Sequence, residues 1–291
     1  MRTRIVAGVV VAAATAHLAA QDPARVQSYQ FELGAGWSMS TTDTSPEIEI
    51  NQYVFAGTYH LKPVMLADHP WNEAAFLEHS TFVQAGAVFA DFEIGNFSAD
   101  GPLFLVGGTY AEKDTPIAAS FNLQMGTLDG DAGIDIDLSE VNGRVGYWLT
   151  PNAILGVQVS LEQTEIETLI DVDTLSYGAF GKVVRDLGEG RAINAVAHID
   201  LVSVDDGTTD EDNVEFGFAA DFYFTPRYSV GALVDFSFGD AVSDEGTTLG
   251  VRGTAWFTPQ LAFNLALATF VADDDAGSDE DTIGAFFTAR F

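Results

Sequence analysis

Seven charged or titratable side chains lie in the middle of alternating apolar and polar segments of this 291-residue chain. An extended strand projects successive side chains to opposite faces, so residues at matching positions gather on one surface. All seven take the positions opposite the apolar face: Arg144, Lys182, Arg252, His198, Asp200, Asp221 and Asp235. If that face lines a wet interior, basic and acidic groups there can filter small solutes by charge and size.

The same residues also suit interior ion pairs that only stabilise the fold. A hairpin folded around Ser243 and Asp244 sets Asp235 directly opposite Arg252, and opposite charges in such cross-strand positions attract. The two interpretations do not exclude each other, because an interior pair also shapes the field along a channel. We keep both.

Catalysis and specific metal binding are weaker interpretations. His198 is the one mid-segment histidine, and Asp200 shares its face, but no Gly-x-Ser-x-Gly motif or metal-ligand spacing accompanies them. Asp129, Asp131 and Asp135 place oxygen ligands at alternate positions without matching the twelve-residue EF-hand loop. The acidic run at residues 273–281 does not match that loop either. We therefore expect no enzyme activity, no cofactor and no specific metal site, with Asp129, Asp131 and Asp135 as weak candidates for one.

The elements that carry these residues alternate with a period of two. In residues 214–224, Val, Phe, Phe, Ala, Phe and Phe alternate with Glu, Gly, Ala, Asp and Tyr. The last residues of the chain repeat the pattern, with Ala285, Phe287, Ala289 and Phe291 on one face. Alternation over about ten residues is typical of a membrane strand with one lipid face and one lumen face.

Two kinds of connection separate these segments and alternate along the chain. One is tight and contains proline or glycine, at residues 114–116, 150–152, 188–190, 225–227 and 258–260. The other is acidic, at residues 41–47, 96–101, 129–133, 165–171, 205–212, 240–246 and 273–281. This predicts an all-β, antiparallel, up-and-down transmembrane β-barrel of about fourteen strands, with twelve and sixteen as alternatives. The expected strands are residues 27–40, 47–61, 79–95, 102–113, 116–128, 134–149, 153–167, 172–187, 191–204, 212–225, 228–239, 247–258, 260–272 and 281–291.

One connection on the turn side is long. It covers residues 63–80, and residues 68–77 within it predict a capped short helix. Aromatic residues near the strand ends predict girdles at the membrane interfaces, although ordinary β-propensity also enriches them. These residues are Trp37, Tyr53, Tyr59, Trp148, Tyr177, Tyr228, Trp256 and Phe257.

Composition and the amino terminus restrict the class of protein. The chain has no cysteine, so disulfides and thiolate metal sites are excluded. Its formal net charge of −31 argues against a nucleic-acid partner, which needs a basic patch. Arg2 and Arg4 precede an apolar run and a small-residue site at Ala20, which predicts a cleaved signal peptide over residues 1–20 and a barrel over residues 21–291.

The closing strand resembles the last strand of Gram-negative outer-membrane β-barrels, whose terminal phenylalanine serves as an assembly signal. This resemblance assigns that role to Phe291 and implies the barrel-assembly machinery as a partner. The proline turns and the insertion at residues 63–80 are similar to porins of Gram-negative bacteria. That similarity implies a place in the outer membrane, with membrane lipid and lipopolysaccharide as surroundings.

The sequence thus predicts a porin-like channel for passive diffusion of small hydrophilic solutes or ions. The alternative is a non-conducting barrel with a filled lumen, whose acidic loops serve adhesion or envelope integrity. A soluble secreted β-sandwich is a third interpretation. The solute and the oligomeric state stay open.

Overall fold

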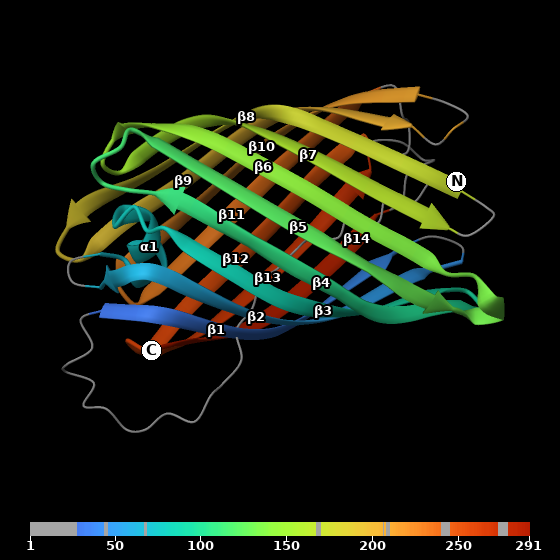
Figure 1. Ribbon diagram of the computed structural model, residues 1–291, viewed down its shortest axis with the longest axis horizontal. Helices are drawn as coiled ribbons and strands as arrows, with labels where there is room; N and C mark the ends of the chain where they lie inside the picture. Colours follow the sequence, from blue (N-terminus) through green and yellow to red (C-terminus); the bar gives the residue numbers. More distant parts are fainter. Residues whose placement is uncertain are drawn as a thin grey trace.

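The computed structural model describes residues 28–43, 46–66, 69–166, 170–205, 207, 210–239, 245–272 and 279–291. Within them, fourteen antiparallel strands form a closed barrel, each paired with its neighbours in the chain (Figure 1). The predicted fold class and strand number are confirmed, while the proposed signal peptide lies outside the described residues. The strands are β1 (Ser28–Thr42), β2 (Ile48–Met65), β3 (Phe82–Ile94), β4 (Phe97–Ala111), β5 (Ile117–Gly130), β6 (Ile136–Thr150), β7 (Ala153–Ile166), β8 (Ile170–Gly188), β9 (Arg191–Asp205), β10 (Asp210–Thr225), β11 (Tyr228–Gly239), β12 (Gly246–Thr258), β13 (Leu261–Ala272) and β14 (Glu280–Arg290).

The seam between β1 and β14 closes the barrel. Their pairing runs from Glu32 opposite Arg290 to Thr42 opposite Glu280. The backbone of Phe291 extends it, since its N–H donates to the Phe31 carbonyl at 2.8 Å and its carbonyl accepts from the Phe31 N–H at 3.0 Å. The sheet therefore has no free edge at which another chain could pair.

The two faces of the wall differ as the alternation predicts. On β4, Phe104 faces outward and is 59% exposed, whereas its neighbour Leu103 faces inward and is 1% exposed. Tyr53 and Tyr177 lie on the outer face, as a girdle requires. The girdle prediction is wrong for Trp148 and Trp256, which are buried inside the barrel at one end.

That end, which we call the turn rim, carries the tight connections. Two residues, Glu189 and Gly190, join β8 to β9 with φ angles of 55° and 73°. Positive φ at both positions defines a type I′ turn, whose twist matches that of the strands. Thr150, Thr225 and Thr258 each end a strand before a proline turn, after a register shift of one residue.

At the opposite end, the loop rim, the strands run further than predicted. Only Gly95 and Asn96 join β3 to β4, and Gly95 has a φ of 61°, so the expected loop over residues 96–101 is wrong. The acidic residues that suggested a loop instead take outward positions on the extended strands. Asp91, Asp100 and Asp129 lie opposite one another on β3, β4 and β5.

Inward-facing apolar residues near the loop rim pack against one another on β2 to β6. We call this group the apolar cluster; none of its members is more than 7% exposed. Phe97, Leu138 and Ile166, which are partly buried, pack against it from β4, β6 and β7. The cluster consists of Val54, Val88, Ala90, Ala99, Leu103, Leu105, Leu128 and Ile136.

The long β2–β3 connection folds at the turn rim. It forms a short 3₁₀ helix, η1 (Trp71–Glu73), and one α-helical turn, α1 (Ala74–Leu77), at the same end of the barrel as the carboxyl end of the chain (Figure 1). The predicted short helix is present, but Pro70 precedes it without a side-chain cap. In the part of the chain that the structure describes, no helix is long and apolar enough to cross a membrane.

Candidate functional site: the charged interior and its plug

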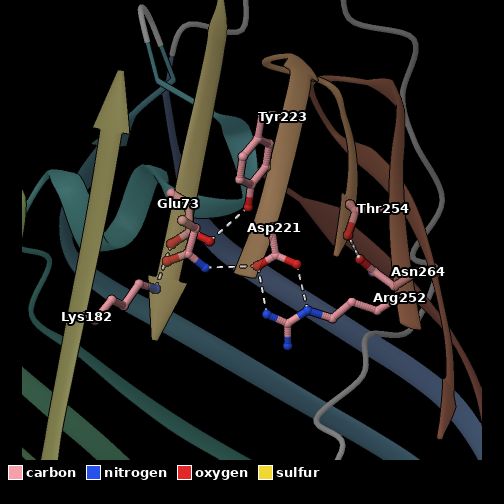
Figure 2. Close-up of polar contacts among 8 residues, drawn as sticks. Glu73, Lys182, Asp221, Tyr223, Arg252, Thr254 and Asn264 are labelled. Atoms are coloured by element: carbon pink, nitrogen blue, oxygen red, sulfur yellow. Dashed lines mark hydrogen bonds and ion pairs between the residues drawn. The ribbon is translucent and has the colours of Figure 1, made fainter. Parts of the chain in front are cut away.

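We call residues 69–80 the plug, because their side chains contact the inner wall of the barrel. Glu73 lies at the centre of these contacts and is 5% exposed. Its Oε2 atom lies 2.6 Å from Lys182 Nζ on β8, and its Oε1 atom accepts a hydrogen bond of 2.9 Å from the Tyr223 hydroxyl on β10 (Figure 2). A buried carboxylate needs such partners, since burying an unpaired charge costs several kcal/mol. Lys182, for which the sequence left both a filter role and an interior ion pair open, thus pairs with a residue of the plug.

Aromatic rings of the wall support the plug from other directions. Trp148 on β6 stacks on His79, with ring centroids 3.8 Å apart and planes 11° apart, and also packs against Phe76. On β12, Trp256 packs edge-on against Trp71 at 6.1 Å. Both indole rings are almost fully buried, at 8% exposure for Trp148 and 1% for Trp256, so they hold the plug by ring packing.

A repeated sequence pattern positions these wall residues, although the sequence interpretation missed it. Trp148, Tyr223 and Trp256 each lie two residues before a threonine that is followed by proline. The proline turn ends the strand, and the register shift before it leaves the ring at the rim, pointing inward. The pattern aromatic-x-Thr-Pro, found three times, is the signal that could have indicated the plug.

The ends of the plug reach the turns of the rim. The Trp71 N–H donates to the Pro226 carbonyl at 2.9 Å, and His79 Nε2 lies 2.8 Å from the Pro151 carbonyl oxygen. Glu78 binds Lys113, in the β4–β5 turn, at 2.9 Å. Because these turns lie on different sides of the barrel, the plug crosses its mouth.

Glu78 is the anchor of the plug that lies closest to solvent. Partial burial on its own would raise the pKa of its carboxyl. Hydrogen bonds from Lys113 and His69, together with their charges, outweigh this effect and hold the pKa of Glu78 below its ordinary value.

Arg252 pairs with Asp221, and the predicted pairing with Asp235 is wrong. Its Nε and Nη2 atoms each lie 2.7 Å from an Asp221 oxygen, in a bidentate ion pair (Figure 2). The β11–β12 hairpin sets Arg252 opposite Gly231, while Asp235 lies opposite Thr248. The hairpin is centred about two residues earlier than expected, and Gly231 has no side chain, so Asp221 reaches across it from β10.

His198 lies between two carboxylates on the same wall. Its ring nitrogens are 2.8 Å from Asp200 Oδ2 and 3.2 Å from Asp235 Oδ1. Gln158 donates to both oxygens of Asp200. Gly217 lies beneath the His198–Asp235 contact, and a Cβ there would overlap both side chains. His198 therefore contacts both Asp200 and Asp235 along the wall, as expected for groups that stabilise the fold.

Arg144 differs from the other predicted residues. It is exposed on the inner wall with its guanidinium 5.7 Å from the Phe180 ring, and it forms no ion pair with any residue that the structure describes. Arg144 is thus the one of the three basic candidates, with Lys182 and Arg252, whose charge is not neutralised by an ion pair among the described residues. An amide ladder from Gln84 on β3 through Asn122 on β5 to Asn142 on β6 makes the adjoining inner wall polar, which sequence reasoning did not anticipate.

The aspartates considered for metal binding lie apart from this interior. Asp131 accepts a hydrogen bond from Ser98 at 2.9 Å, and Asp129 lies opposite Asp100 on the outer face. In the described ranges, no group of three or more His, Cys, Asp or Glu residues is arranged to hold a metal ion.

A closed barrel with an apolar outer band and a polar, charged interior defines the class of outer-membrane β-barrels. The chain belongs to the family described as "Putative general bacterial porin", whose model matches residues 3–291. It is thus a porin-like channel of the Gram-negative outer membrane, for passive diffusion of solutes. Because the strand number is even, the start of β1 and the end of β14 lie at the same rim, the turn rim. Barrels of this class have short periplasmic turns and longer extracellular loops, which makes the turn rim periplasmic and the loop rim extracellular.

Solved structures agree on the fold. The chain is similar to the Acinetobacter baumannii outer membrane protein Omp33, with 22% identity, a TM-score of 0.57, and 91% of this chain and 99% of that chain covered. It is also similar to a mutant of the TodX monoaromatic hydrocarbon channel, with 10% identity, a TM-score of 0.53 and 92% of each chain covered. No protein among the curated ones matches.

Proposed function

We propose that the plug sets the permeability of this channel. Docked, it narrows the periplasmic mouth; displaced, it lets small hydrophilic solutes through more freely. The observation that carries the proposal is the burial of Glu73 between Lys182 and Tyr223, on two different strands. The plug joins the wall through side chains and isolated backbone contacts, so it can leave while every strand of the barrel stays paired.

We further propose that the channel prefers cations and neutral solutes. Lys182 is neutralised by Glu73, Arg252 by Asp221, and His198 lies between two aspartates. The formal net charge of −31 adds a field that attracts cations to the channel. Arg144 is then the residue that limits cation passage, and Arg144→Glu should shift the reversal potential in a salt gradient further toward cation selectivity.

Planar-bilayer conductance tests the role of the plug. Glu73→Gln keeps the shape of the side chain but removes the charge that Lys182 binds, and it should raise the mean conductance or the open fraction. The matched control is Glu112→Gln, which removes a carboxylate paired with Lys62 at the same rim without touching the plug. Replacing residues 70–79 with a short glycine-serine linker should give the largest open conductance.

Two results would contradict the proposal. If the linker variant folds and conducts like the parent protein, the plug is no barrier. If the linker variant folds but passes no current, the barrel is non-conducting, and the alternative of a structural or adhesive barrel takes its place.

We also propose that Phe291 is the assembly signal read by the barrel-assembly machinery, after a signal peptide over residues 1–20 has directed export. In support, the Phe291 ring faces outward beside Phe31 at the seam, at a centroid distance of 6.4 Å. Removing Phe291 should lower the yield of folded protein in the outer membrane. We assign no enzymatic role to His198, whose ring nitrogens both face carboxylates.

A further inference from the structure

Arg290, the penultimate residue, makes a set of contacts that the channel function does not by itself require. It faces the interior at the periplasmic rim and is 3% exposed. Its Nε atom donates to Glu32 Oε2 at 2.6 Å, and its Nη1 atom donates to the Trp71 carbonyl at 2.8 Å. The guanidinium carbon lies 4.1 Å from the centre of the Tyr29 ring and 3.9 Å from that of Trp256. The partners come from β1, the plug and β12.

Two of these partners meet Arg290 only once the barrel is closed. Glu32 and Tyr29 belong to β1, whereas Arg290 belongs to β14, and the two strands lie at opposite ends of the chain. In an open sheet, with β1 and β14 apart, the guanidinium has neither its carboxylate nor the Tyr29 ring. Closure of the seam therefore creates the pocket that holds it.

The same pair ties down both ends of the plug. Arg290 holds the beginning of the plug through the Trp71 carbonyl. Glu32 lies 3.2 Å from His60 Nε2, and His60 Nδ1 lies 2.8 Å from the Ser80 hydroxyl at the end of the plug. The seam pair Arg290–Glu32 thus connects to the first and last turns of the inserted segment.

We propose that Arg290 is a positioning residue that couples plug docking to closure of the seam. The plug docks in its observed place only after β1 and β14 have paired. Conversely, loosening the periplasmic end of the seam releases the plug. Burial makes the coupling strong, because a guanidinium out of water is stable only where a carboxylate and carbonyl oxygens accept its hydrogen bonds. The link to permeability rests on the proposed function, whereas the coupling itself concerns only where the plug lies.

Thiol labelling reports the position of the plug directly. The chain has no cysteine, so a single Ala74→Cys substitution gives one reactive site, which we call the reporter thiol. Ala74 is 0% exposed in the docked plug, so a maleimide should label the folded protein slowly. Adding Arg290→Met, which keeps much of the apolar stem but removes charge and donors, should accelerate labelling about tenfold or more, since losing a buried charged hydrogen-bond partner shifts such equilibria by at least that factor. Arg191→Met, which removes an exposed arginine paired with Glu189 at the same rim, is the matched control and should leave the labelling rate unchanged.

Heat-modifiable gel mobility shows in parallel whether each variant forms a closed barrel. A folded Arg290→Met protein whose reporter thiol stays protected overturns the coupling. If Arg290→Met does not fold, Glu32→Gln provides the milder test, since it keeps the side-chain shape and one acceptor while leaving Arg290 without its counter-charge. Its folded form should label faster than the parent, and unchanged labelling there also overturns the proposal.

Conductance of the same variants separates this proposal from the previous one. Fast labelling with unchanged conductance means that the coupling holds but the plug is not the permeability barrier. Higher conductance in Glu73→Gln together with a protected reporter thiol in Arg290→Met means that the plug is the permeability barrier but that Arg290 does not couple it to the seam.

Discussion

The interior is restricted at both ends, but by different means. Near the extracellular rim, the apolar cluster fills one side with residues that belong to the strands themselves, such as Leu103 and Ile136. At the periplasmic rim, a separate segment crosses the mouth and is held by ion pairs, hydrogen bonds and stacked rings. One restriction is part of the wall, and the other is attached to it.

This difference separates a fixed restriction from one that can be displaced. The apolar cluster cannot leave without unpairing β2 to β6, because its members carry the ladder hydrogen bonds of those strands. The plug contributes no strand to the barrel. Its Ala74 packs in a cluster with Val64 and Leu66, and Phe76 packs near Trp148. Its ion pairs and hydrogen bonds, however, can be exchanged for contacts with water without unpairing any strand. Substitutions in the apolar cluster should therefore lower the stability of the barrel, whereas substitutions at the plug should change conductance and thiol labelling.

The largest effect on stability is expected from Leu103→Ala, in the apolar cluster. Removing a buried leucine side chain costs about 2–5 kcal/mol, through lost burial and the cavity left behind. Unfolding in denaturant, followed by tryptophan fluorescence in micelles, should show this loss, while conductance stays unchanged. Leu155→Ala, on the outer face, is the control and should cost less because detergent fills the space. A Leu103→Ala barrel that is as stable as the parent but more conductive would contradict the view that the apolar cluster is a fixed, stabilising restriction and the plug a displaceable one.

The charged wall between the two regions should behave like the fixed part. Gly217→Ala forces His198 away from Asp235, because the added Cβ overlaps both. Overpacking of this kind costs about 1–3 kcal/mol. At Gly253, an added Cβ would lie 3.6 Å from the Ser229 carbonyl oxygen, an ordinary contact, so Gly253→Ala is the matched control. Equal unfolding midpoints for the two variants would show that the His198 contacts are loose and do not stabilise the wall.

The sequence predicted the repetitive part of the molecule and missed what depends on distant contacts. Period-two alternation and tight turns are local, so the fourteen strands and their ends at residues such as Thr225 and Tyr228 were predictable. The Arg252–Asp221 pair was not, because it spans a strand at Gly231 and depends on the register of a hairpin. The role of Lys182 was missed for a similar reason: its partner Glu73 lies in an insertion whose direction no local pattern indicates.

A smaller effect is expected on the outer face of the extracellular strands. Asp100 lies between Asp91 and Asp129 on neighbouring strands, and like charges in directly opposed positions repel. Asp100→Asn should raise the free energy of unfolding at low salt by a fraction of a kcal/mol, seen as a slightly higher unfolding midpoint. This gain should vanish at about 1 M salt, where screening is nearly complete. Labelling of the reporter thiol in the plug should not change, since this site lies far from it. A gain that persists in high salt would point to a cause other than charge repulsion.

The smallest and most local effect concerns the outer anchor of the plug. Lys113 and His69 hold the pKa of Glu78 below its ordinary value, so ionised Glu78 favours the docked plug at every pH above the ordinary carboxyl pKa. This contribution is lost as the pH falls through the lowered pKa of the docked state, where protonation removes both partners. Because maleimide reacts with the thiolate, each labelling rate is divided by that of the unfolded protein at the same pH. This corrected rate should rise in acid in the Ala74→Cys protein, whereas adding Glu78→Gln should raise it already at neutral pH and remove that part of the acid response. Other carboxylates also titrate in acid, so the contribution of Glu78 is read from the difference between the labelling curves with and without Glu78→Gln. Parallel curves would show that the plug is held at Glu73 and the seam alone, and that its solvent-facing end contributes nothing to docking.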